Sequence, residues 1–320
     1  MGKSQHIHRP AADDMEDTED IALSARADNR AASRTETERQ TRMSRRSFLK
    51  KAAAAAVGTA ALAGGYAAVW EPGNLEVTQF TVHLPRLPAS FNNMRVFHFS
   101  DMHLGFFKDE DDMRRIASVI NGLQPDMICF TGDIVDDYAE SMAGSVPILN
   151  SLHAPLGKFA ILGNHDYRGI PEGVEALYKK TGFTLLKNEH YVIHKDGQSM
   201  AVVGLEDIFM SAPDPEAALQ GLPDGMFKLL LMHEPDYADT AVGYGFDMQL
   251  SGHTHGGQVR IPLLGALLPP PGGRKYIHGL YRVGAEAMPL YVSRGVGTTK
   301  LPIRVLCRPE VSLITLRAAL

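Results

Sequence analysis

Five short apolar runs in this sequence each end at residues of the kind that bind metal ions. Runs this apolar are typical of strands buried on both faces of a parallel sheet, and the carboxyl ends of parallel strands meet at one edge. The runs cover residues 96–100, 127–131, 159–162 and 229–232 and the stretch that ends at 250. The polar residues that follow them are Asp101, His103, Asp133, Asn164, His233, His253 and His255. The pattern therefore predicts an α/β fold in which these side chains gather at one edge.

His253 and His255 stand two residues apart, between Gly252 and the pair Gly256-Gly257. In an extended segment their side chains lie on one face, about 7 Å apart along the backbone, and the glycines let another group approach closely. Two histidines exposed on a loop are the alternative for this pair alone. With the other four strand ends, the pair completes a set of oxygen and nitrogen donors large enough for two divalent ions.

In this order, the blocks Asp-x-His, Gly-Asp-x-x-Asp, Gly-Asn-His-Asp, a lone His after a strand, and Gly-His-Thr-His resemble the calcineurin-like metallophosphoesterases. Each block alone is a weak signal, whereas the order of all five is specific. The resemblance covers residues 94–320, and the segments 293–297, 302–304 and 309–316 are similar to the bacterial membrane-associated branch with its UDP-diacylglucosamine pyrophosphatase-like proteins. The resemblance implies a four-layer αββα sandwich of two mixed sheets, the metallo-dependent phosphatase-like fold, and a metal-dependent phosphoric ester hydrolase.

The resemblance also implies a role for each polar residue at the strand ends. Asp133 would bridge two divalent ions, and a hydroxide between the ions would attack the phosphorus. His165 would stabilise the phosphoryl oxygens or protonate the leaving group, with Asp166 orienting its ring. The remaining implied ligands are Asp101, His103 and His255 for one ion and Asn164, His233 and His253 for the other.

Other roles stay open for some of these residues. Asp101 and Asp133 could form Asx turns at strand ends, and His233 could be a hydrogen-bonded core histidine. Manganese, iron and zinc all suit the donor set, so the sequence leaves the metal open. Asp136 stands where purple acid phosphatases carry a tyrosine ligand, which argues against an Fe(III)-tyrosinate site.

The N-terminal part differs sharply in composition from the rest. Residues 1–43 mix acidic and basic side chains and hold few apolar ones, so we expect a disordered extension there. Residues 44–51, Ser-Arg-Arg-Ser-Phe-Leu-Lys-Lys, and the alanine-rich run after them resemble a twin-arginine export signal. We therefore expect a signal or membrane anchor over 44–70 and a metallophosphoesterase domain over 71–320. A cytosolic basic patch beside an alanine-rich helix is the alternative. Met43 directly precedes the signal, and we hypothesise that translation begins there.

The fate of the apolar run bears on the predicted location. Ala61-Leu62-Ala63 offers a small-x-small cleavage site. Uncut, residues 52–69 are barely long enough to span a membrane, with Trp70 as an interfacial anchor. Export by the twin-arginine machinery predicts a domain in the periplasm or on the outer face of the inner membrane, in contact with the membrane surface.

Composition excludes some classes of function. A net charge of −5 gives no overall attraction to nucleic acid, so we expect no such partner. The two cysteines do not make a disulfide framework, and Cys129, inside an apolar run, is expected to be a buried structural thiol.

Periodicity predicts helices at 111–123, near 139–152 and at 171–180, and further strands at 75–84, 190–195, 198–204, 247–250, 258–261, 276–283, 290–293 and 311–316.

Residues 261–275 form an apolar, proline-rich loop after the His253 and His255 block and end in Arg274 and Lys275. We hypothesise that this loop is a lip of the site that enters lipid, the alternative being a loop packed against the domain's own sheet.

The sequence thus predicts a phosphodiesterase acting on an extracytoplasmic or membrane-associated phosphodiester, lipid-linked substrates included. One alternative is a UDP-diacylglucosamine pyrophosphatase of lipid A synthesis that faces the cytoplasm. Another is a non-catalytic metal-binding envelope protein.

Overall fold

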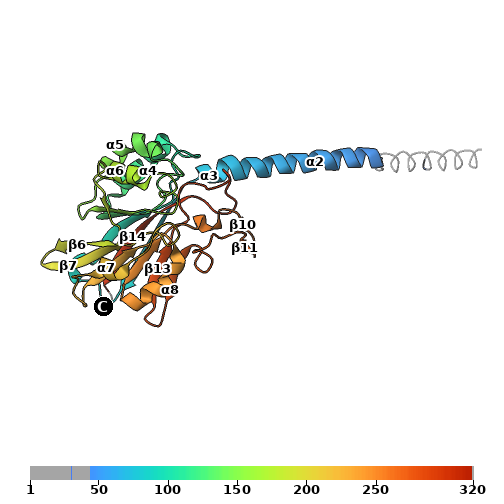
Figure 1. Cartoon of the computed structure of the whole chain (residues 1–320). Coiled ribbons are helices and arrows are strands. Elements are labelled where there is room, and N and C mark those ends of the chain that lie inside the picture. The colour runs from blue at the N-terminus through green and yellow to red at the C-terminus, as the bar shows by residue number, and fades with distance from the viewer. Residues whose placement is uncertain (1–29, 31–43, 319–320) are drawn as a thin grey trace, which may run out of the picture. The chain divides into compact units, whose positions relative to one another are not determined.

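The computed structural model describes residue 30 and residues 44–318 of the chain (Figure 1). The predicted extension over residues 1–43 thus lies outside the described residues, apart from Arg30. By their contacts the residues form two units, Met1–Leu62 and Ala63–Leu320. Within the described part, residues Arg45–Gly73 are helical, and this is the one helix there that is long and apolar enough to cross a membrane, judged by length and composition alone.

The second unit contains two six-stranded sheets, and both mix parallel and antiparallel neighbours. In the first sheet only the pair β14 and β2 is antiparallel. In the second sheet the two outer pairs, β12 with β13 and β6 with β7, are antiparallel. The first sheet runs in the order β1 (Glu76–Leu84), β14 (Glu310–Ala318), β2 (Met94–Phe99), β3 (Met127–Thr131), β4 (Lys158–Ile161) and β5 (Thr184–Leu185). The second runs β12 (Gly279–Val283), β13 (Met288–Val292), β9 (Met248–Ser251), β8 (Phe227–Leu231), β7 (Gln198–Gly204) and β6 (Glu189–Lys195).

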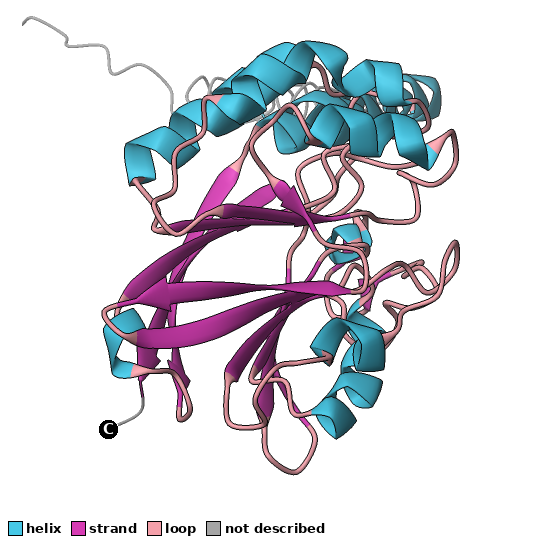
Figure 2. Ribbon diagram, turned by 60° about the vertical axis from the view of Figure 1, so that its left-hand side comes forward, coloured by secondary structure: helices cyan, strands magenta, loops and turns pink. Residues whose placement is uncertain are grey.

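The two sheets face each other across one apolar core. Val96, Cys129 and Ile161 of the first sheet are buried in the same cluster as Val202 and Leu229 of the second. Fully burying an aliphatic side chain of this size contributes about 1.5–3 kcal/mol. Helices cover the outer faces of both sheets (Figure 2). The predicted αββα sandwich of two mixed sheets is confirmed.

The outer layers are built from short helices. The longest, α4 (Glu110–Leu123), begins where the Asp109 carboxylate accepts hydrogen bonds from the backbone N–H groups of Asp111 and Asp112. It ends at Gln124, which adopts a left-handed conformation with φ 48°. The other helical segments are η2 (Tyr66–Trp70), α3 (Glu71–Gly73), η3 (Ala89–Phe91), α6 (Pro171–Tyr178), α7 (Pro215–Leu219), η5 (Pro235–Tyr237), α8 (Ala238–Ala241), η6 (Val242–Tyr244) and η7 (His255–Gly257), and α2 is Arg45–Gly65.

One predicted helix, near residues 139–152, is broken into two pieces. A 3₁₀ helix, η4 (Ala139–Ser145), is followed by the single-turn helix α5 (Val146–Asn150). Pro147 lies in the first turn of α5, the position that tolerates a residue without a backbone N–H, and it prevents one continuous helix through this region.

Five strands bring the predicted site together. β2, β3 and β4 are parallel neighbours in the first sheet, and β8 and β9 are parallel neighbours in the second. Their carboxyl ends lead directly into the predicted polar residues, as the sequence pattern indicated. Cys129 and Cys307 are both free and buried, in agreement with the absence of a disulfide framework.

Candidate metal centre

The seven predicted ligands converge in one buried cluster at the carboxyl ends of these strands. Donor atoms of Asp101, His103 and His255 lie within 4.8 Å of one another, and so do those of Asp101, Asp133 and His233. The remaining two predicted ligands are also in contact, since Asn164 Oδ1 lies 3.0 Å from His253 Nδ1. Six of the seven side chains are buried, and Asn164 is half-buried.

Each of the four histidines is anchored through one ring nitrogen to an oxygen acceptor. Because that nitrogen must carry the hydrogen, the other nitrogen of each neutral ring presents a lone pair. Such outer hydrogen bonds are typical of histidines that bind metal. The four contacts are His103 Nδ1 to Asp136 Oδ1 at 3.0 Å, His233 Nδ1 to Thr131 O at 2.6 Å, His253 Nε2 to Pro271 O at 2.8 Å and His255 Nδ1 to Gly297 O at 3.4 Å.

The inner nitrogens face other acceptors across short gaps. His103 Nε2 lies 3.0 Å from His255 Nε2, and His233 Nε2 lies 3.2 Å from Asp133 Oδ2. His233 Nε2 is buried and makes no hydrogen bond within the described residues. Lone pairs that face each other at such distances repel unless a proton or a cation lies between them. The donor set therefore fits divalent cations.

The carboxylates set the protonation of two histidines. Burial alone would lower the pKa of His233, but the negative charge of Asp133 raises it well above its usual range. Burial likewise opposes the charge on His103, whose pKa is raised by Asp136 and Asp133. Burial lowers the pKa of His253 to about 4. A cation entering the cluster would thus replace protons held by His103 and His233.

The backbone around the ligands is left-handed at five of the seven positions. The φ angles are 54° at Asp101, 50° at His103, 60° at Asp133, 70° at His253 and 51° at His255. This conformation costs roughly 1–2 kcal/mol at each non-glycine residue, and such strain gathers at functional sites. The expectation that His253 and His255 lie on an extended segment is wrong, because β9 ends at Ser251 and the chain then turns.

The strained turns are held together by hydrogen bonds between blocks. The Asp101 carboxylate accepts the backbone N–H of His253 at 2.9 Å, and the Asp133 carbonyl accepts that of His103 at 3.1 Å. A Cβ at Gly252 would lie 2.4 Å from Asp101 Oδ2, so this close approach requires glycine. The ligand blocks therefore fix one another's positions.

His165 and Asp166 occupy different environments. His165 Nδ1 lies 2.9 Å from the Asp136 carbonyl oxygen and 3.0 Å from Asp136 Oδ1. The Asp166 carboxylate accepts the backbone N–H groups of Asp133 at 2.9 Å, Gly163 at 3.0 Å and Val135 at 3.1 Å. The prediction that Asp166 orients the His165 ring is therefore corrected: Asp136 holds the ring, and Asp166 ties the β3 and β4 loops together.

Asp136 is a functional residue whose role the sequence did not reveal. In the sequence it stands only where related enzymes carry a tyrosine ligand, yet its carboxylate contacts both His103 and His165. Burial would raise its pKa, but the hydrogen bond and charge of His103 lower it, so it is an anion between the two rings. The repeated Asp in the Gly-Asp-x-x-Asp block was the available signal.

Arg304 is a second residue whose role the sequence did not reveal. Its guanidinium is fully buried and donates to the carbonyl oxygens of Arg294 at 2.9 Å, Gly295 at 3.1 Å and Cys307 at 3.2 Å, and to that of Gly297. The Gly297 carbonyl also accepts from His255, and the Gly297 N–H donates to the Asp101 carbonyl at 2.7 Å. Arg304 thus supports the loop that backs two ligands.

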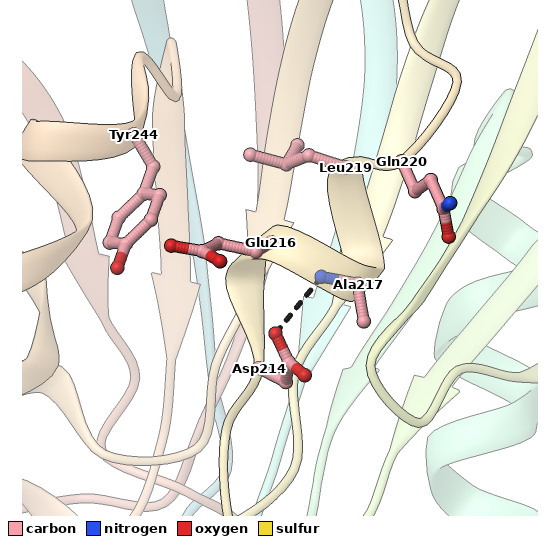
Figure 3. Close-up of a pocket in the computed structure, with 6 residues that line it drawn as sticks. All are labelled: Asp214, Glu216, Ala217, Leu219, Gln220 and Tyr244. Atoms are coloured by element: carbon pink, nitrogen blue, oxygen red, sulfur yellow. Dashed lines mark hydrogen bonds between the residues drawn. The ribbon is translucent and has the colours of Figure 1, made fainter.

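A hollow in the surface lies apart from this cluster, beside α7 (Figure 3). Asp214 Oδ1 accepts the Ala217 N–H there at 2.9 Å and caps the helix. No predicted site residue lines the hollow, whose residues are Asp214, Glu216, Ala217, Leu219, Gln220 and Tyr244.

Comparison with known proteins gives consistent matches over this cluster. Residues 94–257 match the family described as calcineurin-like phosphoesterase. The chain is 39% identical over 284 residues to the uncharacterized metallophosphoesterase YkuE of Bacillus subtilis, covering 87% of this chain and 99% of that protein. It is 30% identical to phosphodiesterase YaeI of Escherichia coli, and the match covers 86% of this chain and 99% of that protein. It is 28% identical to UDP-2,3-diacylglucosamine pyrophosphatase LpxG of Chlamydia trachomatis, and the match covers 76% of this chain and 90% of that protein.

Proposed function

Because this chain belongs to the calcineurin-like phosphoesterase family and is a hydrolase of phosphoesters, we propose that it is a phosphodiesterase with a dinuclear metal centre. The observation that carries the proposal is the set of inward-facing nitrogen and oxygen atoms, above all the Nε2 atoms of His103 and His255, which lie 3.0 Å apart. Similarity to the phosphodiesterase YaeI supports a diester as substrate.

Two groups of residues would hold the ions, with Asp133 shared between them. Cations bound there would neutralise the oxyanions of the ester and lower the pKa of water toward about 7. The neutral amide of Asn164 adds a donor without adding negative charge to its group. The first group is Asp101, His103 and His255, and the second is Asn164, His233 and His253.

His165 would act on the leaving group. Its Nδ1 is held by Asp136, so Nε2 is the nitrogen free to meet substrate. Protonated His165 would give the Nε2 proton to the departing alkoxide oxygen, and the Asp136 carboxylate would stabilise the charged ring before the transfer. A positioned general acid contributes about 10² to 10⁴ in rate. Asp166 would act only by holding the loops that carry Asp133 and Asn164.

The N-terminal segment bears on where the reaction takes place. We propose that residues 44–70 direct export by the twin-arginine machinery, so that the domain acts in the periplasm or on the outer face of the inner membrane. The twin arginines Arg45 and Arg46 and the long apolar helix support this location. The compact unit begins at Ala63, next to the predicted cleavage site, so the metal centre would survive removal of the signal.

A pyrophosphatase is the second candidate function, and the location of the domain distinguishes it from the first. Similarity to LpxG supports a pyrophosphatase that cleaves UDP-2,3-diacylglucosamine. For that function we expect a domain that faces the cytoplasm. A reporter fused after Leu320 distinguishes the two: an export-dependent reporter active outside the cytoplasm favours the phosphodiesterase, and activity only inside favours the pyrophosphatase.

The direct test is turnover of bis-p-nitrophenyl phosphate by the purified chain supplied with manganese, iron(II) or zinc. Asp133→Asn is expected to abolish turnover and metal retention together. His165→Asn is expected to lower kcat about 10² to 10⁴ while both ions stay bound. His194→Asn, at an exposed histidine bonded to Ser199, is the matched control and is expected to behave as wild type. A chain that holds two ions and turns over no diester would instead be a non-catalytic metal-binding protein.

A further inference from the structure

Large apolar side chains stand in solvent along the hairpin of β10 (Arg260–Ile261) and β11 (Gly265–Ala266) and the residues after it. The exposed fractions are 106% at Leu263, 76% at Leu264, 47% at Leu267 and 89% at Leu268. Soluble surfaces rarely keep so many neighbouring leucines in water, and such patches mark sites that bind another apolar phase. The hypothesis that this loop packs against the domain's own sheet is therefore wrong for these four side chains.

Two other segments join the hairpin on the same surface. The Arg260 N–H donates to the Val305 carbonyl at 3.0 Å, and the Arg304 N–H donates to the Ala67 carbonyl at 2.9 Å. Hydrogen bonds thus connect residues 66–70, 259–268 and 301–306, which we name the apolar rim. Its other large exposed apolar side chains are Val69, Trp70, Ile261, Leu301 and Leu306.

We propose that the apolar rim docks on a lipid bilayer and that the substrate is a phosphodiester held in that bilayer by an apolar tail. The substrate part rests on the proposed function. The first argument for a bilayer is continuity, because the rim includes the last turns of the helical stretch Arg45–Gly73, which is long and apolar enough to span a membrane. A chain that leaves a bilayer at Trp70 emerges at the rim itself.

Charge gives the second argument. The segments 259–276 and 299–306 contain no Asp or Glu. They carry exposed cations at Arg274 and Lys300, and Lys300 directly precedes the exposed Leu301. Basic side chains next to an inserted apolar loop are attracted to anionic headgroups. A protein partner would not require this combination of an acid-free rim and a spanning helix.

The rim is also a wall of the metal centre. The Pro271 carbonyl, just after Leu268, accepts from His253 Nε2 at 2.8 Å. At the base of the hairpin, a Cβ on Gly257 would lie 2.2 Å from the Ala266 Cβ. A rim that rests among headgroups therefore brings the cluster to the depth at which lipid phosphates lie.

The chain's single tryptophan allows a direct test of docking. The full chain is reconstituted into vesicles of phosphatidylcholine and phosphatidylglycerol, with and without dibrominated phosphatidylcholine, which quenches tryptophan in contact with acyl chains. We compare Leu268→Trp and Tyr191→Trp, each in a Trp70→Phe background. Tyr191 lies on β6, which Figure 1 draws at the opposite end of the folded unit from β10 and β11.

Docking predicts strong quenching for Leu268→Trp and almost none for Tyr191→Trp. Equal quenching of the two would overturn the proposal. So would an unquenched Leu268→Trp protein that forms a concentration-dependent dimer, because the rim would then bind a second copy of the chain. This readout needs no turnover, so it stands even if the proposed activity fails.

Two substrates with the same leaving group test the substrate class. Hexadecyl p-nitrophenyl phosphate is presented in the same vesicles, and methyl p-nitrophenyl phosphate in solution. Serine at Leu263, Leu264, Leu267 and Leu268 together is expected to lower kcat/KM for the hexadecyl ester about tenfold or more, with the methyl ester changed less than about twofold. Serine at Leu280 and Tyr191, two exposed apolar positions outside the rim, is the control and is expected to change neither. Equal loss on both esters, or wild type without preference for the hexadecyl ester, would refute the lipid substrate.

Discussion

His103 and His255 point their Nε2 atoms at each other from 3.0 Å, while the Nδ1 atom of each ring lies beside an oxygen acceptor. The two rings come from residues 152 positions apart, in loops that follow strands of different sheets. Two ring nitrogens this close in a buried place need a proton or a cation between them. We therefore expect metal binding to displace that proton and to be coupled to the folding of this edge.

Asp136 is predicted to control metal affinity without being a ligand. Asp136→Asn removes the negative acceptor of His103 Nδ1 and of the His165 ring, and we expect metal affinity and kcat/KM to fall about 10- to 100-fold. Metal titration and diester turnover measure the two effects. Asp111→Asn, at an exposed position paired with Arg114, is the control. Unchanged metal affinity in Asp136→Asn would contradict this role.

Asp166 is predicted to contribute to stability rather than to proton transfer. Asp166→Asn weakens an acceptor of three backbone N–H groups, so we expect the free energy of unfolding to fall by about 2 kcal/mol. The pH profile of kcat in the remaining folded enzyme is expected to keep its wild-type shape. Urea unfolding and a pH-rate series check this. A shifted profile at unchanged stability would restore Asp166 as the partner of His165.

Glu310 is predicted to make the fold sensitive to acid. Burial alone would raise its pKa, but Arg294, with Thr78 and Tyr291, lowers it below the ordinary value of 4.5. A carboxylate with a lowered folded-state pKa stabilises the fold above the unfolded pKa, and this stability is lost as the pH falls through the folded-state pKa.

Glu310→Gln is therefore expected to reduce the free energy of unfolding by about 1–2 kcal/mol at neutral pH, and by progressively less as the pH falls below 4.5. Urea unfolding at a series of pH values measures the slope. Glu286→Gln, at an exposed position, is expected to leave the slope unchanged. A Glu310→Gln curve parallel to wild type over the acid range would contradict the assignment.

Arg304 is predicted to be essential to the loop behind the metal centre. Arg304→Met would leave the carbonyl groups of Arg294 and Cys307 without a donor, and each costs about 1–3 kcal/mol, so we expect a loss of at least ~2 kcal/mol. Arg317→Met, at an exposed arginine bonded to Asn93, is expected to stay within ~0.5 kcal/mol. Thermal or urea unfolding compares them, and equal effects would contradict the role of Arg304.

The sequence predicted the strands well because their apolar runs are nearly continuous. β3 begins and ends at Met127 and Thr131 as expected, and the hairpin of β6 and β7 turns at Asp196-Gly197. Convergence of the strand ends followed from parallel pairing. The two-sheet architecture was predicted from the family resemblance, which rests on the order of the five blocks; periodicity alone did not specify it.

Conformation within the loops could not be read in the same way. Left-handed backbone at Asp101, His103 and Asp133 is set by contacts between blocks, and no local propensity of these residues announces it. The partners of Asp136 and Arg304 likewise depend on residues distant in sequence. Local patterns identified which residues carry the chemistry, whereas tertiary contacts decide which side chains orient them.

Anomalous diffraction from crystals grown with manganese tests the central claim most directly. We predict two peaks, one among Asp101, His103 and His255 and one among Asn164, His233 and His253, with the Asp133 carboxylate bound to both. A single ion, ions outside these residues, or a cluster that binds none after reconstitution would contradict the dinuclear centre.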